Sequence, residues 1–164
     1  FLSFYPTHAR ADYAQYKLGM AHYRQMRAPQ RDQSETRAAL RDFEAFVTRY
    51  PNSALLPEVQ AKVREIRDRL SEADFSVGLF YFRQRWYPGA IDRLTAVMKE
   101  NPEYGRRDRV YFFLGESLIK VDRPAEALPY FEKLIAEFET SEHLEDAQAR
   151  IATLKTPAAA KTPL

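Results

Sequence analysis

Small residues recur along this chain at fixed offsets, and this recurrence constrains the fold more than any other feature. Counting Ser71 as the first position of one stretch, Gly78 is the eighth, Ala90 the twentieth and Pro102 the thirty-second. Small residues let two antiparallel helices cross closely, and a proline ends the helix that precedes it. The spacing therefore predicts a helix-turn-helix repeat over residues 71–102.

Two further copies of this pattern occur, one on each side. A shift of 37 residues carries Gly78 onto Gly115, and the upstream copy has a longer loop between its helices. The repeat positions are Gly19, Ala39, Phe43 and Pro51 in the first copy; Gly78, Tyr81, Ala90, Leu94 and Pro102 in the second; and Gly115, Ala127 and Phe131 in the third. This is the tetratricopeptide (TPR) pattern, which predicts an all-α repeat solenoid of antiparallel helix pairs.

The repeats predict a single TPR superhelical domain over residues 1–155. Its parts are three repeats and a final capping helix, at about 9–51, 55–102, 107–139 and 141–154. Residues 156–164 are rich in alanine and proline, and we expect a flexible tail there. The opening residues FLSFYPTH are typical of the end of a TPR helix whose upstream part has been removed.

One helix is expected to be much longer than the others. Apolar residues follow helical spacing from Leu56 to Leu70, and neither glycine nor proline separates them from Ser71. The pattern predicts one extended helix from about Pro57 to Arg85.

Polar residues before two of the predicted helices have the pattern of helix caps. Asp32 with Glu35 three residues later resembles a capping box, in which both side chains bond free backbone amides. Thr140 and Ser141 can cap the last helix.

The composition excludes several functions. The net charge of +2 is too small to indicate nucleic-acid binding, although residues 1–110 carry 19 Lys and Arg against 14 Asp and Glu. Cysteine is absent, the three histidines have no metal-ligand spacing, and no phosphate-binding loop or catalytic motif occurs. No apolar run approaches the roughly 20 residues of a membrane span. We therefore predict no enzyme activity, catalytic residue, cofactor or metal.

Six segments resemble one family. They are YPTH (5–8), ADY (11–13), RDQ (31–33), RYPNS (49–53), RDRL (67–70) and FYFRQRWYPGAIDR (80–93). They resemble the BamD family, the outer-membrane β-barrel assembly lipoproteins, over about residues 1–155. The resemblance implies a scaffold at the periplasmic face of the outer membrane of a Gram-negative bacterium, with a lipid anchor upstream of this chain. The implied partners are the POTRA domains of BamA, other Bam lipoproteins and unfolded β-barrel precursors.

A second family stays open. The segment from Val110 to Phe138 also resembles the C-terminal domain of CpoB, a periplasmic coordinator of cell division. This resemblance implies a free periplasmic adaptor that coordinates cell-envelope or cell-wall machinery.

Six aromatic residues crowd the end of the extended helix, between Phe75 and Tyr87. Among them, Phe75, Phe82 and Trp86 are spaced to share one face. Either all six pack against neighbouring helices, or part of the set forms an exposed docking patch with nearby arginines, because aromatic residues and arginine dominate binding hot spots. The candidate residues of this patch are Arg83, Arg85, Trp86 and Arg93.

Arg93 also matches an arginine that the BamD resemblance places in the region docking on the POTRA domains. The RDQ motif is the other candidate for partner binding. Its residues Arg31, Asp32 and Gln33 either contact a partner or hold the loop, with Asp32 as a cap and the other two bonding within the loop.

Overall fold

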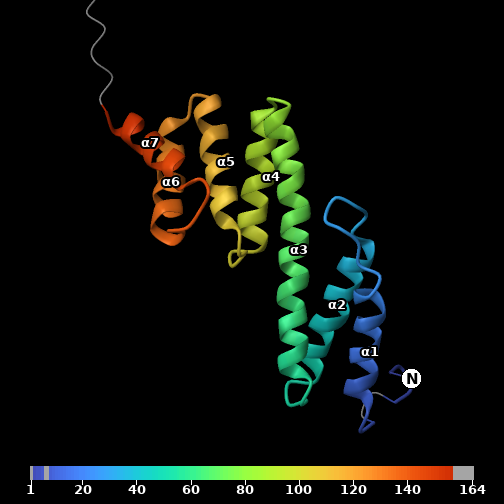
Figure 1. The fold of residues 1–164 in the computed structure, drawn as a ribbon. Coiled ribbons are helices and arrows are strands. Elements are labelled where there is room, and N and C mark those ends of the chain that lie inside the picture. The colour runs from blue at the N-terminus through green and yellow to red at the C-terminus, as the bar shows by residue number, and fades with distance from the viewer. Residues whose placement is uncertain (1, 6–7, 157–164) are drawn as a thin grey trace, which may run out of the picture. The chain divides into compact units, whose positions relative to one another are not determined.

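The computed structural model describes residues 2–5 and 8–156, and within them it contains seven α-helices and no strand (Figure 1). The predicted all-α helical-repeat class is confirmed. The chain divides into two compact units, Phe1–Ala73 and Asp74–Leu164, and the division falls within α3 (Leu56–Arg83). The single domain expected from the repeats stays a prediction.

The extended helix is confirmed, because α3 runs without interruption over 28 residues. Residues 2–4 form a turn rather than the expected helix end. Phe1, Pro6 and Thr7 lie outside the described residues, as does the expected tail from residue 157 onward.

The first unit is built from α1 (Ala11–Tyr23), α2 (Ser34–Arg49) and the first part of α3. Gly19 allows α1 and α2 to approach closely, since a Cβ atom there would lie 2.6 Å from Cε1 of Phe43. The buried core of the unit consists of Ala39, Phe43, Phe46, Val59, Ile66 and Leu70.

Hydrogen bonds in constant register join α1 to α3. The hydroxyl of Tyr16 donates to Glu58 at 2.6 Å, and the hydroxyl of Tyr23 donates to Glu65 at 2.5 Å. Both pairs are separated by 42 residues, so the two helices run in the same direction. The ammonium of Lys62 lies 4.5 Å from the centroid of the Tyr23 ring. Nothing in the local sequence indicated these contacts.

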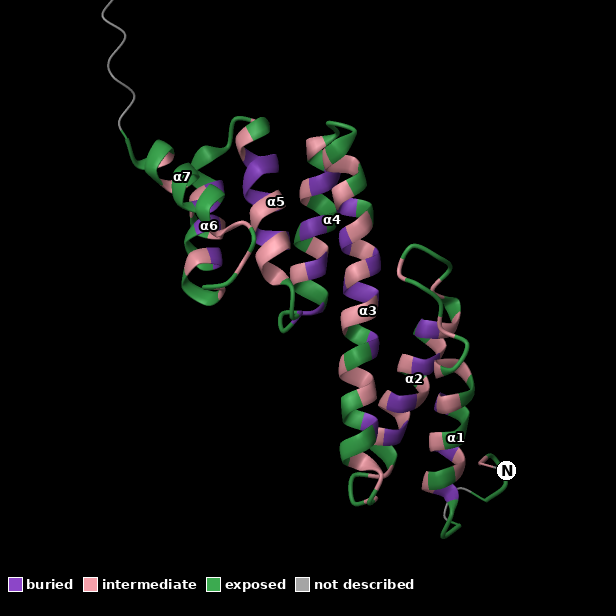
Figure 2. Ribbon diagram, viewed as in Figure 1, coloured by how far each residue is buried: buried purple, intermediate pink, exposed green. Residues whose placement is uncertain are grey.

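The second unit contains the end of α3 and four further helices: α4 (Tyr87–Glu100), α5 (Arg107–Lys120), α6 (Pro124–Glu137) and α7 (Leu144–Lys155). Buried residues gather on the sides of these helices that face one another (Figure 2). A Cβ atom on Gly78 would lie 2.9 Å from Cγ of Leu94, and one on Gly115 would lie 2.6 Å from Cζ of Phe131. In every helix pair, the repeat glycine thus faces a large side chain of the second helix.

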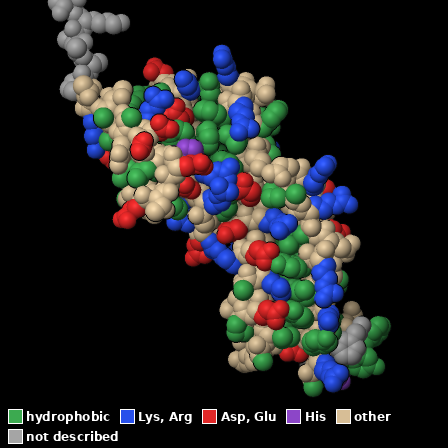
Figure 3. Space-filling model, viewed as in Figure 1, with side chains coloured by type: hydrophobic (Ala, Val, Ile, Leu, Met, Phe, Trp, Pro, Cys, Tyr) green, Lys and Arg blue, Asp and Glu red, His purple; other side chains and the backbone are tan. Residues whose placement is uncertain are grey.

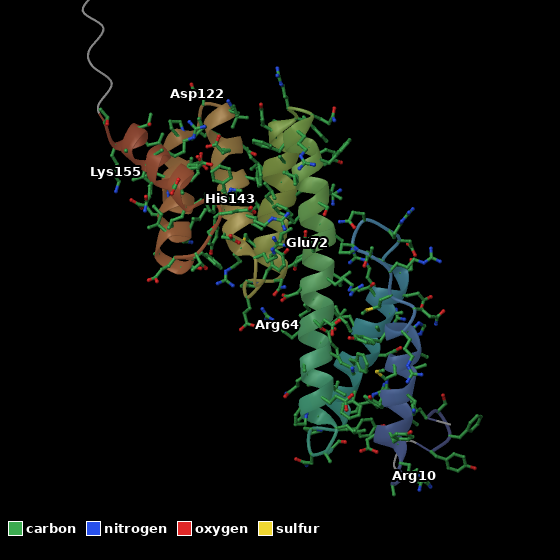
Figure 4. All side chains as sticks on the ribbon, in the orientation of Figure 1. Arg10, Arg64, Glu72, Asp122, His143 and Lys155 are labelled. Atoms are coloured by element: carbon green, nitrogen blue, oxygen red, sulfur yellow. The ribbon has the colours of Figure 1, made fainter. Side chains whose placement is uncertain are left out.

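Two turns of the second unit use the same backbone geometry. Arg85 and Asp122 have φ angles of 60° and 61°, the left-handed conformation that residues other than glycine rarely adopt (Figure 4 labels Asp122). The amide of the next residue bonds the carbonyl five positions earlier, as in the bond from Trp86 to Tyr81. This is the Schellman motif, and its two copies are separated by the repeat shift of 37 residues.

The capping box expected before α2 is wrong. Gln33, not Asp32, occupies the position before the helix, and Asp32 accepts a hydrogen bond from the amide of Ser34 at 3.3 Å. Glu35 does not reach back to the chain, because its carboxylate pairs with Nδ1 of His22 at 2.6 Å. The contact between Glu35 and His22 of α1 thus takes the place of the expected bond from Glu35 to the backbone before α2.

The start of α7 also differs from the expectation. The helix begins at Leu144, and Ser141 lies too far upstream to cap it. Ser141 instead donates to Asp108, near the start of α5, at 2.6 Å. Ser53 makes the equivalent bond to Asp12 of α1, also at 2.6 Å. In both units a serine after a helix pair is thereby tied to the start of that pair.

An ion pair fastens α7 to α5. Nε and Nη2 of Arg150 lie 2.5 and 2.9 Å from the two carboxylate oxygens of Glu116, which is only 6% exposed. The ring of His143 stacks on Phe112 with 4.3 Å between the centroids. These contacts hold the last helix against the repeat before it.

Candidate partner-binding surface

The aromatic residues at the end of α3 separate into an inner and an outer group. Phe75 and Phe82 belong to the inner group, because their ring centroids lie 6.0 and 5.1 Å from that of Phe113. Phe75 is buried and Phe82 is half-buried. These two residues contribute to the core of the second unit.

Trp86 does not share a face with Phe75 and Phe82, so that expectation is wrong. α3 ends at Arg83, and the left-handed turn at Arg85 redirects the chain. The indole packs against Tyr81 at 4.6 Å between centroids, in an edge-on arrangement. Gly89 leaves room for it, since a Cβ atom there would lie 2.6 Å from Cε3 of the indole. The turn thus displays Trp86 on the surface.

The outer group is exposed to solvent. Phe80 is 56% exposed, Trp86 55% and Val77 37%, and these are the exposed large apolar side chains among the described residues of the second unit. The centroid of the Phe80 ring lies 5.9 Å from that of Tyr81, the same tyrosine that packs against Trp86. The half-buried Tyr81 therefore packs against both exposed aromatic residues.

Three arginines accompany these apolar side chains. Arg83, Arg85 and Arg93 are exposed, and their guanidinium groups make no hydrogen bond or ion pair with any described residue. Cβ of Arg93 lies 3.5 Å from the Cβ position of Gly78, which places this arginine beside α3. We call the set the aromatic-arginine patch; its members are Val77, Phe80, Arg83, Arg85, Trp86 and Arg93.

The paired arginines of the second unit differ from these three. Arg107 lies 3.2 Å from Glu137, and Arg123 forms a fork with Glu126 at 2.6 and 2.7 Å. An exposed guanidinium without a carboxylate partner retains its full capacity to bind one on another molecule. The patch combines this capacity with exposed aromatic area, the two components that dominate protein-binding hot spots.

The RDQ motif holds its own loop through two of its residues. Nε2 of Gln33 donates to the carbonyls of Ala28 and Arg31 at 2.8 and 2.9 Å, and its Oε1 accepts from Thr36 at 2.8 Å. Asp32 accepts hydrogen bonds from the amide and the hydroxyl of Ser34, the first residue of α2. Arg31 is exposed, and within this motif only its side chain makes no hydrogen bond or ion pair with a described residue.

The described residues contain no group of three or more side chains suited to hold a metal ion. None of the helices described is both long and apolar enough to cross a membrane. The fold defines the class of protein: an α-helical repeat protein of the tetratricopeptide type.

The family is shown by a match to the family model YfiO, described as "Outer membrane lipoprotein", over residues 1–114. The chain therefore belongs to the YfiO outer-membrane lipoprotein family. The aromatic-arginine patch lies wholly within the matched residues. The match favours the BamD resemblance over the CpoB resemblance.

Curated relatives carry the name "Outer membrane protein assembly factor BamD". The protein of Caulobacter vibrioides is 28% identical over 127 residues, which cover 77% of this chain and 42% of the relative. That of Vibrio cholerae is 31% identical over 108 residues, with coverages of 60% and 45%. That of Rickettsia prowazekii is 24% identical over 130 residues, with coverages of 79% and 52%. The chain thus spans about half the length of the curated relatives it matches.

Proposed function

We propose that this chain is a non-enzymatic scaffold of outer-membrane protein assembly that docks on the POTRA domains of BamA. It acts at the periplasmic face of the outer membrane, together with other Bam lipoproteins, and helps deliver unfolded β-barrel precursors. The names of its relatives support the general role. The aromatic-arginine patch is the observation that supports docking.

The chemistry of the patch fits a protein partner with an acidic edge. Phe80 and Trp86 offer apolar area that a partner can cover, and their packing on Tyr81 limits the side-chain entropy lost on binding. Arg93 is exposed beside α3 and can form a forked pair with a carboxylate of the partner. Covering the aromatic residues would remove water from this pair and strengthen it.

Charge reversal at Arg93 tests the proposal. Arg93→Glu should weaken binding to purified POTRA domains by about 2 kcal/mol, or roughly 30-fold, because it sets two carboxylates against each other. Isothermal titration calorimetry measures the loss. The matched control is Arg37→Glu, which makes the same change at an exposed arginine of the first unit whose side chain makes no hydrogen bond or ion pair with a described residue.

Circular dichroism should show an intact fold for both variants, because surface substitutions on helices shift stability by less than about 0.5 kcal/mol. Unchanged POTRA affinity in a folded Arg93→Glu protein would exclude this arginine from the interface. Equal losses in both variants would indicate a general charge effect in place of a docking site.

A further inference from the structure

Pairing within the first unit separates the charges of the α1–α2 hairpin by sign. Residues 24–44 contain five arginines and four acidic residues, so their net charge is small. All five arginines are exposed. Of the four acidic residues, Asp32 is exposed, Asp42 is largely buried, and the side chains of Glu35 and Glu44 are 40% and 45% exposed but contact partners within the first unit. The outer surface of this end of the hairpin is consequently basic. We call these residues the hairpin-end arginines: Arg24, Arg27, Arg31, Arg37 and Arg41.

The acidic residues of this segment are engaged within the first unit. Glu35 lies 2.6 Å from Nδ1 of His22, and Asp42 lies 3.6 Å from Nε2 of the same ring. Glu44 pairs with Arg67 at 2.7 Å. Asp32, as described above, bonds the residue that begins α2. None of these carboxylates pairs with a hairpin-end arginine.

The arginines contribute to the loop through their backbones only. The carbonyl of Arg27 accepts a hydrogen bond from Arg69 at 2.9 Å, and that of Arg31 accepts one from Gln33. The guanidinium groups of Arg27, Arg31 and Arg37 make no hydrogen bond or ion pair with described residues. Figure 3 shows blue side chains projecting at this end of the hairpin.

We propose that the hairpin-end arginines bind the phosphate groups of an anionic phospholipid surface. Guanidinium groups bind phosphate oxygens in a forked geometry. Between residues 19 and 76, no described side chain is an exposed large hydrophobic one, so this surface lacks the apolar anchor that protein interfaces use. A charged hairpin end without such an anchor suits a layer of headgroups.

Membership of an outer-membrane lipoprotein family places a lipid surface near this chain. A basic surface is a common addition to the attachment that a lipid anchor provides. Each arginine close to an anionic lipid surface raises the equilibrium constant for binding of the protein to that surface by about fivefold. The inference rests on family membership and is independent of docking on POTRA domains.

Flotation of the full chain with vesicles tests the inference. The vesicles are phosphatidylcholine alone, or phosphatidylcholine with about one-third phosphatidylglycerol. The chain should float with the anionic vesicles, and the triple variant Arg27→Gln/Arg31→Gln/Arg37→Gln should lose binding by on the order of a hundredfold. The matched control, Arg83→Gln/Arg85→Gln/Arg93→Gln, removes the same charge from the second unit and should retain vesicle binding.

The two triple variants should give opposite results with purified POTRA domains, where the control should lose affinity and the hairpin-end variant should not. Failure of one proposal is therefore distinguishable from failure of the other. Raising the salt concentration should release the unmodified chain from the anionic vesicles, a readout that needs no variant.

Three results would overturn the lipid assignment. The chain could fail to float with anionic vesicles, or both triple variants could lose vesicle binding equally, which would indicate net charge alone. Retention on immobilised poly-glutamate without flotation would identify an acidic polypeptide as the ligand.

Discussion

Arg85 holds a backbone conformation that glycine adopts with less strain, and its side chain belongs to the aromatic-arginine patch. Asp122 occupies the equivalent turn of the next repeat with nearly the same φ angle, so the repeat architecture requires this geometry at both places. At Arg85 the turn has a second consequence. It brings Trp86 onto Tyr81 and leaves both the indole and the guanidinium exposed.

Two substitutions at position 85 separate strain from charge. Arg85→Gly and Arg85→Ala both remove the guanidinium, but only the glycine variant is free of the left-handed penalty of about 1–2 kcal/mol. Part of this gain is offset by the greater freedom of glycine in the unfolded chain, so we expect the glycine variant to be more stable by about 0.5–1 kcal/mol. Urea unfolding measures the difference. An alanine variant of equal or greater stability would contradict the left-handed turn.

Among the elements, α7 depends on one buried carboxylate. Glu116 of α5 is 6% exposed and receives both nitrogens of the Arg150 fork, whereas the Arg150 side chain is 44% exposed. The two partners are therefore not equivalent. Without Glu116, the arginine can turn to water, but without Arg150 the carboxylate stays buried and unpaired.

This asymmetry predicts the order of three variants. Arg150→Ala should destabilise the second unit by about 2 kcal/mol, less than the loss for a fully buried pair because the arginine is partly exposed. Glu116→Gln should have a smaller effect, and the double variant should be more stable than Arg150→Ala alone. Thermal unfolding followed by circular dichroism gives the order. A double variant as unstable as the sum of the two single ones would show that the residues do not interact.

Across the whole molecule, the features that could be predicted from the sequence are those that depend on residues close together along the chain. The repeat glycines and the extended helix follow from periodic spacing. The structure contains the three closely packed helix pairs and the 28-residue α3. The capping box failed because Glu35 pairs with His22, a residue outside the local window. The separation of Trp86 from Phe75 and Phe82 also escaped prediction, since no glycine marked the left-handed turn at Arg85.

Contacts between distant segments were equally invisible in the sequence, although they join the helices of the first unit. The bonds from Tyr16 to Glu58 and from Tyr23 to Glu65 cross 42 residues each. Tyrosine and glutamate on helix surfaces have no pattern that identifies a partner so far along the chain. The repeat arrangement, with its parallel first helices, brings them together.

The same bonds predict how the stability of the first unit depends on pH. Burial and the hydrogen bond to Glu65 raise the pKa of Tyr23 to about 12. The hydrogen bond to Glu58, with burial, raises the pKa of Tyr16. Because the folded-state pKa of Tyr23 exceeds its ordinary value of 10.0, unfolding releases a proton between these values. Its contribution is therefore complete below pH 10 and is lost as the pH rises through about 12.

Tyr23→Phe tests this dependence. At pH 8 the variant should be less stable than the unmodified chain by about 1 kcal/mol, because it lacks one charge-assisted hydrogen bond to a carboxylate. As the pH rises from 10 to 12 the difference should shrink, since only the unmodified chain must then keep a proton on Tyr23 to remain folded. Urea unfolding followed by circular dichroism at several pH values measures both stabilities. Tyr50→Phe is a suitable control, because its hydroxyl makes no hydrogen bond with a described residue. A stability difference that stays constant through pH 12 would show that the Tyr23 hydroxyl is not bound to Glu65.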